Sequence, residues 1–308
     1  MVGYEIFLQQ MVNGITLGGI YALIALGYTM VYGIIELINF AHGDVFMLGA
    51  FIALTLLTTL GLTNTLNGAT LVIALLGVLI ATGVLTGFVG VIVERVAYRP
   101  LRNAPRLAPL ISAIGVSFIL QNIVFVWMGP NNQRFPNILP NPTHDFGHVT
   151  VTTKEVLIVA LSIVLMVALH SFVQRTRLGK AMRATAQDRE AASLMGIDVN
   201  QTIALTFFIG SLLAGAAGIV YGLYYNSIRF DLGYEAGLKA FTAAVLCGIG
   251  NIGGAMTGGF LIGIISALAT QYIPNGDAWA NAVVFGILIL VLVFRPQGSL
   301  GQRLAERA

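Results

Sequence analysis

The sequence predicts an all-α integral membrane protein, formed by a single transmembrane domain over residues 1–308, and three observations indicate it. Hydrophobic residues make up 57% of the 308 positions and charged residues only 9%, against roughly 25% charged in ordinary soluble domains. Several apolar stretches reach the roughly 20 residues that a helix needs to cross a bilayer. The 36 glycines agree with this, because glycine is more frequent in membrane helices than in soluble ones.

About eight helices that span the membrane fully or in part are expected. Six apolar stretches form clear candidates, the last of them short: residues 14–34, 70–93, 107–127, 156–173, 203–224 and 282–294. Residues 45–60 are short for a full crossing. Residues 236–272 are long enough but are interrupted by Gly248, Gly250, Gly253 and Gly254. Because glycine disfavours helix, this stretch predicts an interrupted helical hairpin near the C-terminus, with two short helices joined by a turn.

Small residues recur at a spacing of four in several of these stretches. One ridge is Gly14 and Gly18, and another runs from Gly210 through Ala214 and Gly218 to Gly222. Such ridges let two helix backbones approach closely in lipid. We expect them to pack helices within this chain, and a subunit interface is the alternative.

The distribution of Lys and Arg predicts the orientation. Residues 94–106, 171–201 and 295–307 hold twelve of the 16 positive residues, and an even number of expected crossings separates these segments. Because positive loops stay in the cytoplasm, this side should be cytoplasmic. The C-terminus is then cytoplasmic, and the N-terminus and the loop of residues 129–154 face the periplasm.

No motif predicts catalysis by this chain. The sequence has neither the G-x-x-x-x-G-K-[ST] phosphate-binding motif nor a serine or cysteine nucleophile motif. Its four histidines do not cluster with carboxylates at metal-ligand spacing. It also lacks the dense basic run with aromatic residues that nucleic-acid binding needs. We therefore expect no enzymatic activity, no cofactor, no metal and no nucleic-acid partner.

Polar residues at two places are candidates for a translocation path. Between the first two apolar stretches lie Glu36, Asn39, His42 and Asp44, with no Lys or Arg among them. A plain surface loop explains them as well as a break in the membrane that lines a water-filled path. Lys239 is the other candidate, although the favoured interpretation is that its ammonium reaches the membrane interface.

The segment of residues 179–198 predicts a short helix on the cytoplasmic side. Thr185 followed by Asp188 resembles a capping box, and Gly196 is a typical C-terminal stop. Leu194 and Met195 are then exposed near its end. Because so short a helix is not stable alone in water, we expect it to bind a partner surface, with the bilayer surface as the alternative.

Several segments together resemble the LivH-type permease subunits of branched-chain amino acid ABC importers. The resemblance covers nearly the whole chain, and the loop of residues 129–154 alone lacks an obvious family pattern. The segments that carry it are NGITLGGIYAL (13–23), GYTMVYGI (27–34), INFAHGD (38–44), ERVAYRP (94–100), LISAIG (110–115) and GLKAFTAAVL (237–246). Two positions depart from the family pattern: Cys247 replaces a usual glycine, and Ser266 a common glutamate.

The resemblance implies a subunit of the bacterial inner membrane that works in a complex. Its partners would be a second, LivM-like permease, two cytoplasmic ATPases that use ATP and Mg, and a periplasmic substrate-binding protein. The segment 179–198 would be the coupling loop, which binds an ATPase groove. Its docking residues would be Gln187, Arg189, Ala192, Leu194, Met195 and Gly196.

Three alternatives stay open from the sequence. An ion-coupled secondary transporter needs acidic residues within several helices, and the expected spans hold almost none. A channel needs a filter sequence, and none is apparent. An ABC permease for urea, amides or sugars keeps the same mechanism, and the sequence does not choose which amino acid is carried.

Overall fold

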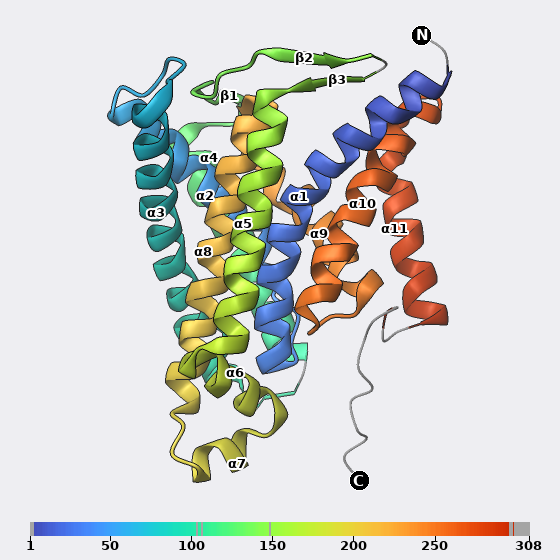
Figure 1. The fold of residues 1–308 in the computed structure, drawn as a ribbon. Helices are drawn as coiled ribbons and strands as arrows, with labels where there is room; N and C mark the ends of the chain where they lie inside the picture. Colours follow the sequence, from blue (N-terminus) through green and yellow to red (C-terminus); the bar gives the residue numbers. More distant parts are fainter. Residues whose placement is uncertain (1–2, 103, 106, 148, 296–297, 299–308) are drawn as a thin grey trace.

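The computed structural model describes residues 3–102, 104–105, 107–147, 149–295 and 298. Within that part, seven helices are long and apolar enough to cross a membrane. They are α1 (Gly3–Ile35), α2 (His42–Thr59), α3 (Gly68–Val93), α4 (Leu107–Met128), α5 (Thr153–Arg175), α8 (Val199–Tyr225) and α10 (Ile252–Tyr272). They form one bundle (Figure 1), and the predicted all-α membrane fold is confirmed.

The other elements are shorter or lie at the ends of the bundle. The π-helical turn η1 (Glu94–Tyr98) and the 3₁₀ turn η2 (Arg99–Leu101) extend α3, and α6 (Arg177–Gln187) and α7 (Arg189–Leu194) follow α5. The remaining helices are α9 (Leu232–Cys247) and α11 (Gly276–Phe294). Four short strands form two antiparallel pairs: β1 (Gln133–Arg134) with β4 (Ser227–Ile228), and β2 (Thr143–Phe146) with β3 (Val149–Thr152).

Helix α1 lies at the centre of the bundle, against α10, α8, α9 and α5. Its contact with α10 is backbone to backbone. A Cβ on Gly18 would lie 2.6 Å from Cα of Phe260, and a Cβ on Gly263 would overlap the backbone of Gly18. A Cβ on Gly218 of α8 would likewise lie 2.6 Å from the backbone nitrogen of Ala50 in α2. These glycines therefore pack helices within the chain, as expected.

Replacing Gly263 with alanine is expected to destabilise the fold, because the new methyl group has no space between α10 and α1. Overpacking of this kind costs about 1–3 kcal/mol. The change should lower the midpoint of thermal unfolding of the purified protein in detergent. Gly286→Ala in α11 is the matched control, because a Cβ there has no neighbour within 4 Å. Equal midpoints for the two variants would show that α1 and α10 are not in this close contact.

The predicted break near the C-terminus lies between α9 and α10. Gly248 and Gly250 have φ angles of 103° and 95°, which side chains with a Cβ rarely adopt. The amide of Gly254 donates to Asn251 Oδ1, which caps α10. Gly254 is therefore inside α10, not in the break. With 21 residues, α10 is also longer than the short helix that the sequence predicted.

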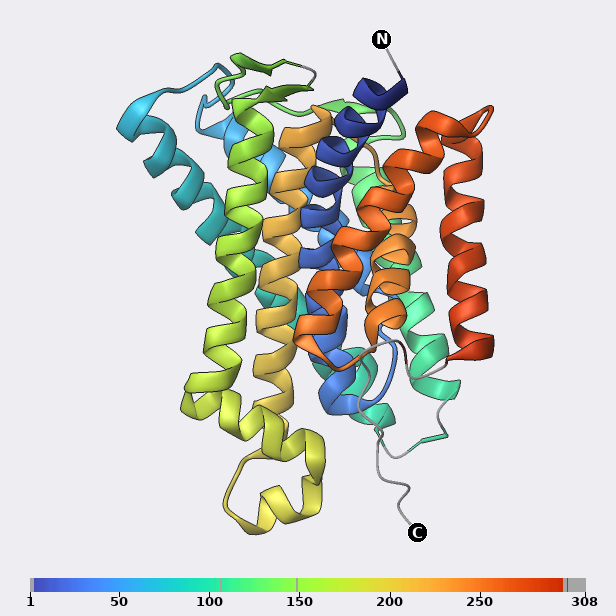
Figure 2. The ribbon, with the colours of Figure 1, turned by 45° about the vertical axis from the view of Figure 1, so that its right-hand side comes forward.

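The two ends of the bundle differ in structure and charge. The start of α1 and both strand pairs lie at one end, and α6, α7 and the last turn of α11 lie at the other (Figures 1 and 2). η1 and η2 follow α3 at this second end. The described arginines of the three positive segments are therefore at the same end of the bundle. Arg106, Arg303 and Arg307 lie outside the described residues.

The β2–β3 pair is joined to α1 by one glutamine. Gln9 Nε2 donates to the carbonyl of Thr150, and the amide of Thr150 donates to Gln9 Oε1, both at 3.0 Å. The side-chain amide therefore pairs with β3 as a strand backbone would. Next to it, Thr152 and Glu155 form a capping box that begins α5.

Candidate functional site

The polar segment between the first two helices is a non-helical connection of residues 36–41, called the break below. Helix α1 ends at Ile35, and Glu36 has a φ of 54°, in the left-handed region that ends a helix. Helix α2 begins at His42. Glu36 is exposed, whereas Asn39, His42 and Asp44 are buried. The break thus brings three of the four predicted path residues into the interior and leaves one at the surface.

Asn39 is held by a tyrosine from η1. The Tyr98 hydroxyl donates to Asn39 Oδ1 at 3.0 Å, and the Tyr98 ring packs against Phe207 of α8 with centroids 5.3 Å apart. His42 lies edge-on to Tyr28 at 4.8 Å, where Gly27 leaves room for its imidazole ring. The break is therefore fixed by packing from α1, η1 and α8.

Asp44 is held by two side chains of α4. Ser117 Oγ donates to Asp44 Oδ2 at 2.5 Å, and Gln121 Nε2 donates to Oδ1 at 3.0 Å. The two donors are one helical turn apart, so they face α2 together. The carboxylate also lies in the first turn of α2, where a negative charge complements the helix dipole. Sequence reasoning missed both donors.

Lys239 lies far from the break residues in the chain and has its own partners. Its ammonium lies 2.9 Å from Glu235 Oε1, one turn earlier in α9, and 6.0 Å from the ring centre of Tyr21. Tyr21 is near the middle of the 33-residue α1. An ion pair with Glu235 thus holds the ammonium beside α1, and the interpretation that it reaches the membrane interface stays a prediction.

The segment 179–198 contains two helices, not one. Thr176 caps α6 by accepting a hydrogen bond from the amide of Gly179, and Asp188 caps α7 by accepting from the amides of Glu190 and Ala191. Thr185 is buried inside α6, so the predicted capping box is wrong. The expected stop at Gly196 is present, with a φ of 83°.

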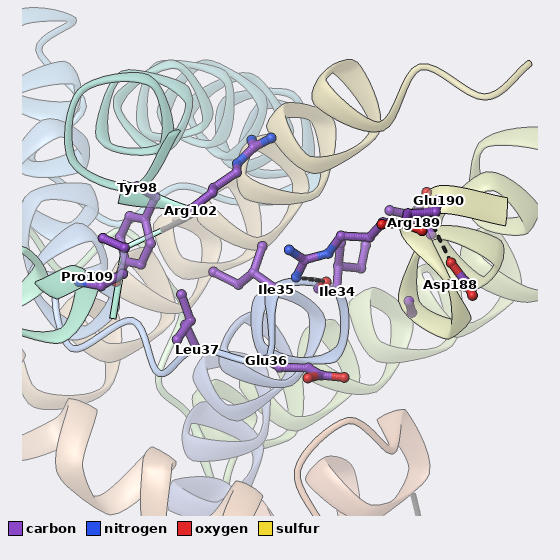
Figure 3. A pocket seen from close by; sticks show the side chains of 13 residues that line it. Ile34, Ile35, Glu36, Leu37, Tyr98, Arg102, Pro109, Asp188, Arg189 and Glu190 are labelled. Carbon is purple, nitrogen blue, oxygen red and sulfur yellow. Dashed lines mark hydrogen bonds between the residues drawn. The ribbon is translucent and has the colours of Figure 1, made fainter. Parts of the chain in front are cut away.

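The six predicted docking residues divide into two groups. Leu194 and Met195 are 88% and 83% exposed, and Gln187 and Gly196 are exposed beside them. Ala192 is buried. Arg189 points toward the bundle: its Nη2 donates to the carbonyl of Ile34 at 2.9 Å, in the last turn of α1 (Figure 3). The six residues therefore do not form one exposed surface.

A cavity of about 470 Å³ lies where α1, the η1–η2 segment and the segment of residues 179–198 meet (Figure 3). It is lined by charged side chains of both signs: Glu36, Arg102, Asp188, Arg189 and Glu190. Arg102 forms an ion pair with Glu94 and donates to Asn200 Oδ1 at 2.6 Å. Burial lowers the pKa of Arg102, and the Glu94 carboxylate acts in the opposite direction. The side chains around this cavity thus connect the break with the segment of residues 179–198.

Comparison with known proteins assigns the chain to a family. Residues 10–292 match the model described as branched-chain amino acid transport system, permease component. The chain is 47% identical to the high-affinity branched-chain amino acid transport system permease protein BraD of Pseudomonas aeruginosa, with 98% of each chain covered. It is 45% identical to the corresponding permease protein LivH of Escherichia coli K12, covering 98% of this chain and 97% of that protein.

A more distant relative is also similar over most of the chain. The probable branched-chain amino acid transport permease protein LivH of Methanocaldococcus jannaschii is 28% identical, and the match covers 94% of this chain and 91% of that protein. The similarity therefore includes the break, the segment of residues 179–198 and the α9–α10 hairpin together. The chain belongs to the family of permease components of branched-chain amino acid transport systems.

Proposed function

We propose that this chain is the permease subunit of an ABC importer for branched-chain amino acids. The observation that carries the proposal is 45–47% identity, over almost the full length, to permeases named for that transport. The geometry agrees: a bundle with a polar break in its interior is joined to a loop whose apolar tip is exposed. The chain itself is not an enzyme in this proposal.

The proposal includes partners that supply energy and substrate. Two cytoplasmic ATPases use ATP and Mg, a second LivM-like permease completes the path, and a periplasmic binding protein delivers the amino acid. The chain lies in the inner membrane with its N-terminus in the periplasm and its C-terminus in the cytoplasm. The grouping of the described arginines at the coupling-loop end supports this orientation.

The break is the part of the path that the ATPases move. Arg189 joins the coupling loop to the last turn of α1, and Tyr98 joins η1 to Asn39. A rigid-body shift of the loop is therefore transmitted to both sides of the break. Glu36, Asn39, His42 and Asp44 lie within or next to the segment that moves.

Uptake of radiolabelled leucine into proteoliposomes tests the function. The vesicles contain this chain with the second permease, the ATPases and the binding protein encoded with it. We expect uptake that requires ATP and stops when ATP is replaced by a non-hydrolysable analogue. ATP-independent uptake by this chain alone would instead indicate a secondary transporter, and ATP-dependent uptake of sugars or urea but not amino acids would change the substrate.

A further inference from the structure

Helices α9 and α11 present a polar cluster that the break does not include. Lys239 Nζ donates to Glu235 Oε1 at 2.9 Å, and Asn281 Nδ2 of α11 donates to the same oxygen at 3.1 Å. The Glu235 side chain is 57% exposed, whereas that of Lys239 is 12% exposed. Among the described residues, both hydrogen bonds that reach this carboxylate go to Oε1, and none goes to Oε2.

The cluster lies at membrane depth. The ammonium of Lys239 is beside Tyr21, near the middle of α1, and α11 extends beyond Asn281 by three further turns of apolar helix. Figure 2 shows α9, α10 and α11 side by side over this height. A charged side chain at this depth is costly in lipid and almost always faces protein or a water-filled cavity.

Exposed side chains elsewhere on the bundle are different. The outward faces of α3 and α5 are apolar, with Ile73 and Val164 among the most exposed residues. Those faces suit lipid contact. The face with Glu235 does not, because its carboxylate has one oxygen unpaired. It therefore faces water or another subunit in the assembled transporter.

The chemistry of the cluster fits a zwitterion. A free amino acid carries an ammonium and a carboxylate on the same carbon atom. Glu235 Oε2 can accept a hydrogen bond from the ammonium, and the Lys239 ammonium and Asn281 amide can donate to the carboxylate. A sugar or urea has no such pair of opposite charges. Both signs within one helical turn therefore favour an amino acid over those solutes.

We propose that Glu235, Lys239 and Asn281 form a transient binding site for the charged groups of an amino acid as it crosses the membrane. The proposal rests on the proposed function and names the residues of this chain that contact the substrate. It places the contact on the side of α9 where Lys239 lies beside Tyr21 of α1 and Glu235 bonds to Asn281 of α11. It also explains why α9 carries an ion pair where the neighbouring helices are apolar.

Accessibility of position 235 to a water-soluble thiol reagent tests the site. Cys247 is the single cysteine and is buried, so Cys247→Ala gives a cysteine-free background. Glu235→Cys is compared with Val164→Cys. The native Val164 side chain is 62% exposed on the apolar face of α5. In the assembled complex, a charged methanethiosulfonate reagent should label position 235 but not position 164. Leucine supplied by the binding protein should slow the labelling several-fold.

Three other outcomes would overturn the proposal or its basis. Labelling of position 235 in the isolated subunit but not in the complex means that the second permease covers this face. No labelling in either means that the face contacts lipid. If the wild-type complex takes up leucine and one of these two labelling patterns is found, the proposed binding site is wrong but the proposed function stands. If the wild-type complex takes up no amino acid, the proposed function itself fails.

Charge exchange separates substrate binding from structural support. The double variant Glu235→Lys, Lys239→Glu keeps an ion pair but reverses its order. We expect it to fold with near-normal thermal stability and to lose leucine uptake by about tenfold or more, because a hydrogen bond to a charged group is lost. Full uptake by this double variant, with reduced uptake by each single one, would show that the pair serves structure only.

Discussion

Uptake is expected to fall at least about 100-fold when Leu194 and Met195 are both replaced by aspartate. Both side chains are exposed at the end of α7, beyond the bundle. A hot-spot residue at the centre of an interface costs about 2 kcal/mol or more when it is removed, so losing two of them weakens binding by more than about 100-fold. The ATPases should then no longer copurify with the chain, and ATP-dependent uptake should stop.

The control for this change keeps the apolar surface. The exchange Leu194→Met, Met195→Leu preserves size and hydrophobicity and should retain copurification and uptake. The aspartate variant should still unfold at the wild-type temperature, because neither side chain packs on the bundle. Normal uptake in the aspartate variant would show that the ATPases dock elsewhere.

Replacing Arg189 with methionine is expected to separate ATP hydrolysis from transport. Its guanidinium donates to the carbonyl of Ile34 in the last turn of α1. The last carbonyls of a helix lack partners within it, and a positive charge there complements the helix dipole. A hydrogen bond to a charged group contributes about 1.5–3 kcal/mol, which corresponds to a loss of coupling of roughly 10- to 100-fold.

The test measures leucine uptake and ATP hydrolysis in the same proteoliposomes. The exposed tip of α7 is unchanged in Arg189→Met, so the ATPases should still bind and hydrolyse ATP while uptake falls. Arg177→Met is the matched control, because Arg177 is exposed at the start of α6, just before that loop. A parallel fall in hydrolysis and uptake would indicate that Arg189 contacts the ATPase instead, as the family resemblance implied.

The sequence predicts the parts of this fold that depend on neighbouring residues. Apolar length predicts the spans, and the polar residues from Glu36 to Asp44 mark where the first two helices separate. Glycines at 248 and 250 indicate the break between α9 and α10. In each case the physical cause acts within a few residues, so the sequence contains it.

Contacts between distant residues could not be predicted in this way. Asp44 and Ser117 are separated by 73 positions, Asn39 and Tyr98 by 59, and Arg189 and Ile34 by 155. Nothing local indicates that these atoms meet. For the same reason the sequence placed Arg189 among the exposed docking residues, although its side chain reaches back to α1.

One local pattern was misread because a stronger local interaction was present. Thr185 and Asp188 have the spacing of a capping box, but Thr185 is buried in α6 and Asp188 caps α7. The spacing alone could not show that a second helix begins at Arg189.

Helix α1 joins the two ends of the bundle without an interruption. Gln9 binds one end to the β2–β3 pair, and Arg189 binds the other end to the segment of residues 179–198. At a rise of 1.5 Å per residue its 33 residues follow a path of about 50 Å. Hydrogen bonds near its two ends therefore link the strands at one end of the bundle to the segment at the other through a single continuous helix.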